Sequence, residues 1–267
     1  MDDISARALS ILRSVAAIAA EDTRHSRYLL QQANITTPLF SLHEYNERDI
    51  AERMVERLLS GDSLALISDA GTPLVSDPGY HVVKAAQDAG LRVSPIPGPC
   101  ALIAALSVAG LPTDRFIFAG FLSAKTTARQ QQLQRLVKEP YTLIFYEAPH
   151  RILDLIPDLL TVFGPEREMV IARELTKTFE TVHRCTIAEM QSWLTHDPHQ
   201  QKGEFVVMLK GYEATVDEIE SQEQMLAILD ILIGEKLPLK QAVAICAKIT
   251  GFSKNKLYDM ALERYAS

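Results

Sequence analysis

The sequence predicts an α/β protein with two α/β domains, the first built on a parallel sheet and the second on a mixed sheet, followed by a tail with a helix-turn-helix pattern. Apolar runs of strand length alternate with helical apolar spacing through the first two-thirds of the 267 residues. This alternation requires crossover connections, which favour parallel strands covered by helices on both faces. Toward the C-terminus the spacing is helical only. We therefore divide the chain into residues 1–113, 114–212, an acidic linker at 213–224 and a tail at 225–267.

The first domain is expected to open with a helix at residues 4–12, because Ile4, Leu9 and Leu12 recur at helical spacing behind two aspartates. Apolar runs predict four strands, at Val15–Ala20, Leu39–Leu42, Leu64–Ile67 and Leu91–Ile96. Helices are predicted at 24–32, behind the N-cap candidate Asn46, from about 80 to 89, and at 99–109. Residues 110–114, with one glycine and one proline, interrupt the pattern and mark the domain boundary.

The second domain repeats the alternation. Strands are predicted at 116–119, 142–146, 168–172, 179–185 and 204–210, with helices at 127–137, 151–163 and 187–194. A single helix joins the last two strands, whereas longer crossovers join the others, so the sheet is expected to be mixed. In the tail we predict helices at 225–233, 239–249 and 254–264, with Ser253 as an N-cap and Gly251 in a sharp turn.

Composition narrows the classes of protein. Hydrophobic residues make up 47% and charged residues 23%, which excludes wholesale disorder. No apolar stretch approaches the roughly 20 residues of a membrane span, and the acidic N-terminus does not resemble a secretory signal. The net charge of −7 argues against broad nucleic-acid binding. Three separated cysteines, Cys100, Cys185 and Cys246, favour the reducing cytoplasm and argue against a structural zinc site.

Three loops of the first domain could carry chemistry, because they follow strands whose carboxyl ends would share one sheet edge. Residues 21–25 place two carboxylates after an apolar strand, although a plain helix N-cap would look the same. Residues 68–79 hold more glycine and proline than a crossover needs, which favours a backbone cradle for a ligand. Residues 95–101 combine prolines, a glycine and small residues ahead of a helix N-terminus.

The second domain has two such loops, at residues 146–151 and 172–180. Surface ion pairs of little energetic weight would explain them equally simply. We favour a functional role for these two loops, because cations and carboxylates concentrate at strand ends that would face the first domain.

Five segments together resemble the tetrapyrrole-methylase-like family of S-adenosylmethionine-dependent methyltransferases, and within it the members that modify ribosomal RNA. They are Ala19–Arg24, Ser68–Gly79, Pro97–Ala101, Phe145–Arg151 and Arg173–Lys177. The resemblance covers nearly the whole chain. It implies two α/β domains around a cofactor cleft, a homodimer, and methyl transfer to the ribose 2′-oxygen of a cytidine in the decoding region of 16S rRNA in the small ribosomal subunit.

The resemblance also assigns residues. It places S-adenosylmethionine against the set Ser68, Asp69, Ala70, Gly71, Thr72, Cys100, Ala101, Leu102, Tyr146 and Glu147. Because methyl transfer to a hydroxyl requires removal of its proton, we expect Asp22 or Glu174 to accept that proton. Arg24, Arg151 and Lys177 would hold phosphate or polarise the reacting ribose. No metal is expected.

Family members carry an apolar strand and a Pro-x-Gly-Asn type loop ahead of the segment that matches Asp2-Asp3-Ile4, whereas this chain begins at Met1. In the family that strand is central in the sheet and its loop lines the cofactor cleft. We therefore expect an extended chain to bind the cofactor more tightly and to melt at a higher temperature.

The tail is locally basic, and Lys248, Lys254 and Lys256 are expected to contact RNA, although a helical hairpin packed on the second domain would show the same apolar pattern. Two other functions stay open. One is methylation of a small tetrapyrrole-like molecule, which would not need the basic tail. The other is an RNA-binding or ribosome assembly factor without a cofactor, which a titration with S-adenosylmethionine would distinguish.

Overall fold

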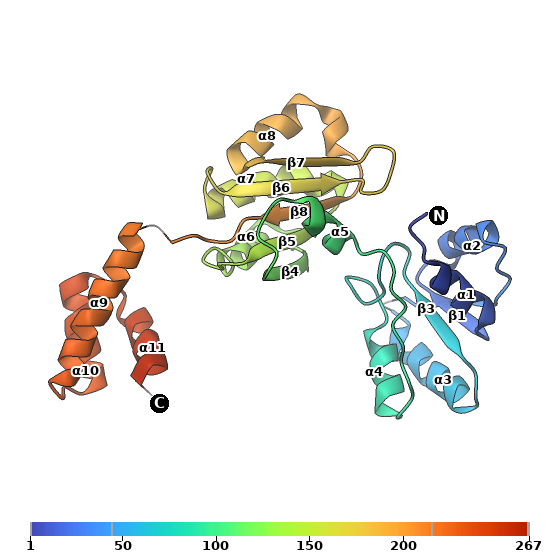
Figure 1. The fold of residues 1–267 in the computed structure, drawn as a ribbon, viewed down its shortest axis with the longest axis horizontal. Coiled ribbons are helices and arrows are strands. Elements are labelled where there is room, and N and C mark those ends of the chain that lie inside the picture. The colour runs from blue at the N-terminus through green and yellow to red at the C-terminus, as the bar shows by residue number, and fades with distance from the viewer. Residues whose placement is uncertain (1, 44, 215, 266–267) are drawn as a thin grey trace. The chain divides into compact units, whose positions relative to one another are not determined.

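The computed structural model describes residues 2–43, 45–214 and 216–265, although the side chains of 216–222, 256, 263 and 265 are not described. The chain forms two compact units, Met1–Gly211 and Tyr212–Ser267. The α/β fold with a helical C-terminal part is confirmed (Figure 1).

A three-stranded parallel sheet forms the first part of the larger unit, in the order β2-β1-β3. The central strand is completely buried, and its successive residues Ile18 and Ala19 face two separate hydrophobic clusters. One cluster receives side chains from α1 and α2, the other from α3 and α4. The elements are α1 (Ala6–Ser14), β1 (Ala17–Ala20), α2 (Thr23–Gln32), β2 (Leu39–Ser41), α3 (Glu47–Leu59), β3 (Leu64–Ile67) and α4 (Tyr80–Asp88).

The prediction of a strand at Leu91–Ile96 is wrong. In the described part of the chain this segment pairs with no strand, and residues 92–95 are exposed. A strand forms only beside a partner, and within this range Pro95 also has no backbone N–H to donate to one. Asn46 stands at the N-cap of α3 as expected, but its side chain does not bond to the helix. Its Oδ1 accepts the N–H of His43 at 2.8 Å instead.

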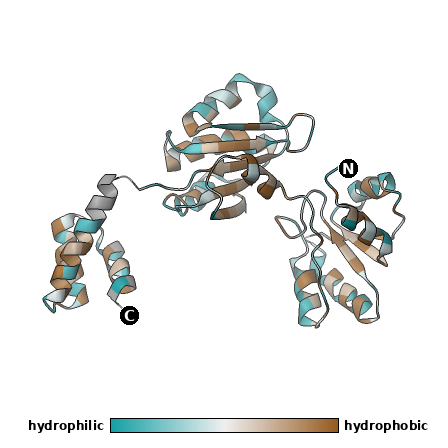
Figure 2. Ribbon diagram, in the orientation of Figure 1, coloured by the Kyte–Doolittle hydropathy of each residue, from teal (hydrophilic) through white to brown (hydrophobic). Residues whose placement is uncertain are grey.

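The second part of the larger unit is a five-stranded sheet in the order β4-β5-β8-β6-β7. Only β4 and β5 are parallel, so the predicted mixed sheet is confirmed. The buried strands β5, β6 and β8 are strongly apolar (Figure 2). The elements are α5 (Ala101–Val108), β4 (Phe116–Phe121), α6 (Thr126–Gln134), β5 (Thr142–Glu147), the short helix η1 (Pro149–Arg151), α7 (Ile152–Phe163), β6 (Glu168–Arg173), β7 (Thr181–Thr186), α8 (Ile187–His196), the short helix η2 (Pro198–Gln201) and β8 (Phe205–Leu209).

Helices cover both faces of the five-stranded sheet. One face packs against α6, α7 and α8 through a large cluster around Phe145, Leu155 and Ile171. The opposite face packs against α5, whose Leu102, Ala105 and Leu106 join Ile144, Val170, Val206 and Met208 in a second cluster. This contact holds the start of α5 at the end of β5, where the candidate site lies.

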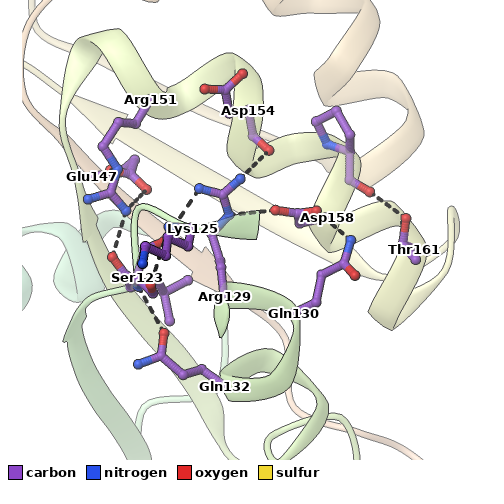
Figure 3. Close-up of polar contacts among 12 residues, drawn as sticks. Ser123, Lys125, Arg129, Gln130, Gln132, Glu147, Arg151, Asp154, Asp158 and Thr161 are labelled. Carbon is purple, nitrogen blue, oxygen red and sulfur yellow. Dashed lines mark hydrogen bonds and ion pairs between the residues drawn. The ribbon is translucent and has the colours of Figure 1, made fainter. Parts of the chain in front are cut away.

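An ion pair is buried between α6 and α7 (Figure 3). Arg129 and Asp158 are 2% and 3% exposed, and Arg129 Nε lies 2.5 Å from Asp158 Oδ2. Arg129 also donates to the carbonyl of Asp154, and Asp158 accepts a hydrogen bond from Gln130 Nε2 at 2.6 Å. The charges are therefore paired and hydrogen-bonded, which is the condition under which buried charges are tolerated.

The smaller unit consists of α9 (Val216–Gly234), α10 (Leu239–Thr250) and α11 (Lys254–Tyr265). Its core joins Met225, Leu229, Val243, Cys246 and Leu257. Gly251 ends α10 in the left-handed conformation, with φ +74°, as the predicted sharp turn requires. The stretch expected as an acidic linker at 213–224 is mostly helical, because α9 begins at Val216.

Replacement of Asp158 by alanine should strand the Arg129 charge in the core and lower the free energy of unfolding by about 3–5 kcal/mol. Urea denaturation measures this loss. The matched control is Asp62→Ala, which breaks the partly exposed pair of Asp62 with Arg57 and should cost less than about 1 kcal/mol. Equal losses in the two variants would contradict the role assigned to the buried pair.

Candidate functional site

A cavity of about 460 Å³ lies at the carboxyl ends of β1, β3 and β5 and also reaches β6 and β8. Its volume is within the range of roughly 300–1,000 Å³ that is usual for small-molecule sites. Eight of the ten residues predicted to bind a cofactor line it: Asp69, Ala70, Gly71, Thr72, Cys100, Ala101, Tyr146 and Glu147. Ser68 and Leu102 are not among its described lining residues, but the N–H of Leu102 donates to Oη of the lining residue Tyr146 at 3.1 Å.

The loop after β3 forms one wall of the cavity and has an unusual backbone. Gly71 has φ +99°, and Leu74 and Ser76 have φ of +72° and +69°, a region that side chains other than glycine rarely adopt. Thr72 Oγ1 donates to the carbonyl of Pro99 at 3.0 Å and so joins this loop to the proline-rich segment before α5. The loop is therefore held in one shape rather than free to relax.

Two further contacts tie the strand ends together. The side chain of Asp69 accepts the backbone N–H of Asp22 at 3.0 Å, which joins the loop after β3 to the loop after β1. The buried carboxylate of Glu47 accepts the N–H groups of Gly79 and His81, at 2.9 and 2.7 Å, and caps α4 from the start of α3. The parallel sheet thus presents three loops as one connected edge.

The charge of the cavity is strongly negative. Five carboxylates line it, those of Glu21, Asp69, Asp77, Glu147 and Glu204, and its lining among the described residues includes no Lys, Arg or His. Burial raises the pKa of Asp77, and the nearby charge of Asp69 adds to the effect. Such a site favours a ligand that carries positive charge.

Glu147 is the most deeply buried of these carboxylates, with an exposed fraction of 2%. Burial raises its pKa, although the N–H of Ala148 and the guanidinium of Arg151 act in the opposite direction. Arg151 Nε lies 3.0 Å from Glu147 Oε1, and Arg151 Nη2 donates to the carbonyl of Leu122 (Figure 3). Arg151 therefore supports the wall from behind and does not line the cavity.

The remaining wall is apolar and partly aromatic. The ring of Tyr146 meets Phe121 edge-on at a centroid distance of 5.6 Å, and Phe118 at 4.8 Å. Val75, Leu175 and other aliphatic side chains complete this side. A ligand that combines a flat ring with a cationic group would match both halves of the cavity.

The residues predicted to be catalytic surround the cavity but do not line it. Asp22 follows the lining residue Glu21, and Arg24 binds Asp22 with Nη2–Oδ2 at 2.9 Å. Those bonds to Arg24 lower the pKa of Asp22 to about 2. Asp22 is therefore a weak proton acceptor near neutral pH.

Glu174 is held in a similar way on the other side of the cavity. Its Oε1 accepts the N–H of Glu204 at 2.9 Å and a hydrogen bond from Lys177 Nζ at 3.0 Å. The bond from the Glu204 N–H and the Lys177 charge lower the pKa of Glu174. Lys177 also pairs with the lining residue Glu204, with Nζ–Oε2 at 2.8 Å.

Sequence reasoning missed three lining carboxylates. Glu21 and Asp77 lie inside the loops at 21–25 and 68–79, and the proline and glycine that follow Asp77 are a signal that marks it. Glu204 carries no such signal, because it stands before β8, a strand that runs antiparallel to its neighbours.

The lysines predicted to contact RNA lie in the smaller unit. Lys248 and Lys254 are exposed on either side of the turn between α10 and α11. Lys256 belongs to α11, but its side chain lies outside the described residues. In the part of the chain that the structure describes, no helix is both long and apolar enough to cross a bilayer.

Comparison with known proteins now defines the class. Residues 1–191 match the model of the tetrapyrrole (corrin/porphyrin) methylases, and residues 219–264 match that of the RsmI C-terminal HTH domain. The chain belongs to the tetrapyrrole (corrin/porphyrin) methylase family.

Two relatives with high identity carry a name that refers to ribosomal RNA. The chain is 56% identical to the ribosomal RNA small subunit methyltransferase I of Pseudomonas aeruginosa, over 99% of this chain and 93% of that protein. It is 49% identical to the protein of the same name from Escherichia coli O157:H7, over 98% of this chain and 91% of that protein.

Solved structures share the fold at low identity. The methyltransferase CobJ has a TM-score of 0.57 at 18% identity, covering 80% of this chain and 92% of CobJ. Diphthine synthase has a TM-score of 0.59 at 14% identity, covering 82% and 88% of the two chains.

The opposite pKa shifts of Glu147 and Glu174 predict opposite pH dependences of stability. A raised pKa in the folded state stabilises the fold at low pH, and this contribution is lost as the pH rises through that pKa. A lowered pKa gives stability that is present at higher pH and lost on acidification. From about pH 4 to pH 7, Glu147→Gln should therefore gain stability relative to the unmodified protein, and Glu174→Gln should lose it. Melting temperatures at several pH values measure both trends, and slopes of the same sign would contradict the assignment.

Proposed function

We propose that this chain is an S-adenosylmethionine-dependent methyltransferase that methylates the ribose 2′-oxygen of a cytidine in the decoding region of 16S rRNA. Two lines of support differ in kind. The cavity, with its carboxylates and its aromatic wall, supports the proposal of the cofactor. The names of the relatives from Pseudomonas aeruginosa and Escherichia coli O157:H7 support the proposal of a ribosomal RNA substrate. A ribosomal substrate agrees with a cytoplasmic protein, and the family resemblance supports a homodimer.

The cavity is the observation that carries the cofactor proposal. S-adenosylmethionine supplies an electrophilic methyl group on a positively charged sulfur, and it also carries an ammonium group and a purine ring. Carboxylates such as Glu21 and Asp69 suit the positive charges, and the wall of Phe121 and Tyr146 suits the ring. The left-handed backbone at Gly71 leaves room for close approach, because the position of a Cβ there meets only the Pro99 carbonyl, at 3.8 Å.

Removal of the ribose hydroxyl proton calls for a base near the transferred methyl group. Asp22 and Glu174 remain candidates, but their lowered pKa values make both poor proton acceptors. Asp77 and Glu147 line the cavity, and burial raises the pKa of each carboxyl. We therefore favour Asp77 or Glu147 for this role. Arg151 would hold Glu147 in place, and Arg24 and Lys177 would meet phosphate groups near the rim.

The experiment that tests this function combines cofactor binding with methyl transfer. The protein should bind S-adenosylmethionine in a calorimetric titration and should produce 2′-O-methylcytidine in unmethylated small ribosomal subunits, as detected by mass spectrometry of nuclease digests. Binding without transfer to the ribosomal substrate would leave the cofactor proposal standing and refute the RNA proposal. Absence of binding would refute the cofactor proposal.

Gly71→Val should weaken S-adenosylmethionine binding by roughly tenfold or more, because a β-branched residue at φ +99° forces the loop out of its shape. The matched control is Gly61→Val, at φ +103° in the turn before β3, where no atom lies within 4 Å of the Cβ position. Both variants carry backbone strain, but only the first touches the cavity. Calorimetry measures the affinities, and equal affinity in the two folded variants would exclude the loop from the site.

Replacement of Lys248, Lys254 and Lys256 by glutamine should weaken binding to the small subunit and flatten its dependence on salt. Each lost phosphate contact should reduce the slope of log affinity against log salt by roughly 0.7–0.9. Cofactor affinity should not change. The control is Lys236→Gln with Lys240→Gln, at the other end of α10, which should leave the slope nearly unaltered. An unchanged slope in the triple variant would assign the tail a purely structural role.

A further inference from the structure

Two tyrosines are unusually exposed at the carboxyl-end edge of the three-stranded sheet. Tyr45 is 95% exposed and follows β2, and Tyr80 is 60% exposed and begins α4, directly after the loop that follows β3. Exposure on this scale leaves most of each ring without protein contacts. We call these two residues the tyrosine rim.

Polar contacts fix the backbone on either side of both tyrosines. On the side of Tyr45, Asn46 bonds to the His43 N–H and to the Ser41 carbonyl, and the His43 ring meets Tyr45 edge-on. The use of Asn46 for this purpose explains why its side chain does not cap α3. Its contacts close the turn and leave the tyrosine facing outward.

Tyr80 is fixed by the residues on either side of it. The N–H groups of Gly79 and His81 both donate to Glu47 Oε1, and the His81 ring meets Tyr80 edge-on at 5.3 Å. Because Glu47 is only two residues from Tyr45, the same carboxylate brings both tyrosines to one region of the edge. The rim is thus a built feature with a buried anchor.

The rim is linked to the cavity through residues that neighbour both. Tyr80 comes three residues after the lining residue Asp77. On the other side, Ser41 of β2 approaches the carbonyl of the lining residue Glu21, at 3.5 Å. A polymer whose reacting nucleotide enters the cavity would therefore have its neighbouring nucleotides near the rim.

The chemistry of the edge fits unpaired nucleotides. Bases stack on exposed aromatic rings whatever their sequence, whereas the carboxylates of the cavity repel phosphates. Arg24 and Arg48 are exposed at the starts of α2 and α3 and could meet those phosphates. A second protein is a poorer fit, because interfaces bury about 800 Å² per partner around an apolar centre, and the exposed residues beside Tyr45 are the polar Arg48 and Asp49.

We propose that Tyr45 and Tyr80 stack on unpaired bases that flank the target nucleotide and so position the RNA strand at the cavity. This inference rests on the proposed function, since it requires an RNA substrate. Stacking adds affinity without reading sequence, so selection of the nucleotide falls to the cavity itself.

The test compares Tyr45→Ala and Tyr80→Ala with Tyr45→Phe and Tyr80→Phe in the full chain. The probes are a fluorescein-labelled single-stranded RNA that carries the target sequence and unmethylated small subunits. Each alanine variant should weaken RNA binding by about 5- to 150-fold and raise KM for the subunit, with kcat and S-adenosylmethionine affinity nearly unchanged. Each phenylalanine variant should bind like the unmodified protein, because the ring remains.

Leu59→Ala is the matched control, because Leu59 is 64% exposed but lies at the opposite end of α3. It should not alter RNA affinity. Alanine variants with unaltered RNA affinity, or phenylalanine variants as weak as alanine, would overturn the stacking role. So would a change in mass by light scattering, which would assign the rim to a second copy of the chain. An unmodified protein that neither binds nor methylates RNA would overturn the proposed function itself.

Discussion

The parallel pairing of β1 with β2 and β3 is the constraint on which the candidate site depends. Because the three strands run in one direction, the loops that follow them leave the sheet at the same edge. Short contacts then turn proximity into a fixed arrangement: Asp69 binds the Asp22 backbone, and Glu47 binds the start of α4. The five-stranded sheet supplies the opposite wall, with Tyr146 at the end of β5 and α5 packed on its face.

Acidic and basic side chains gather in different parts of the molecule. Carboxylates are gathered in the cavity, where they suit a cationic methyl donor, and exposed lysines stand at the turn between α10 and α11. An RNA chain would be attracted to the lysines and repelled from the cavity floor. A neutral aromatic surface such as the tyrosine rim reconciles these demands, because stacking needs no charge. Net charge alone, at −7, conceals this arrangement.

Much of the fold was predictable from periodicity, since β1 and β5 are buried apolar strands, β3 is an apolar strand of intermediate burial, and each is followed by a polar or glycine-rich loop. Six of the eight predicted lining residues come from such loops or strand ends, and the other two, Cys100 and Ala101, stand at the start of α5. The failures have physical causes. Residues 91–96 have the apolar character of a strand, but a strand forms only beside a partner, which a local pattern cannot reveal.

The local sequence pattern does not predict the other residues of the site either. Glu204 and Phe121 reach the cavity only through the order of strands in the mixed sheet. The bonds from Arg24 lower the pKa of Asp22, and the bond from the Glu204 N–H, together with Lys177, lowers the pKa of Glu174. Sequence identifies the acid, whereas its protonation depends on what the fold places beside it.

The strained loop after β3 also limits how the protein can be made more heat-resistant. Leu74 and Ser76 occupy left-handed conformations that cost on the order of 1 kcal/mol each, and glycine at either position would release that energy. Glycine at these positions would also make the loop that shapes the cavity more flexible. The gain in stability would therefore be accompanied by a loss of ligand affinity. A thermostable form must instead draw its stability from regions such as the core around Phe145 and Leu155, where packing and catalysis do not compete.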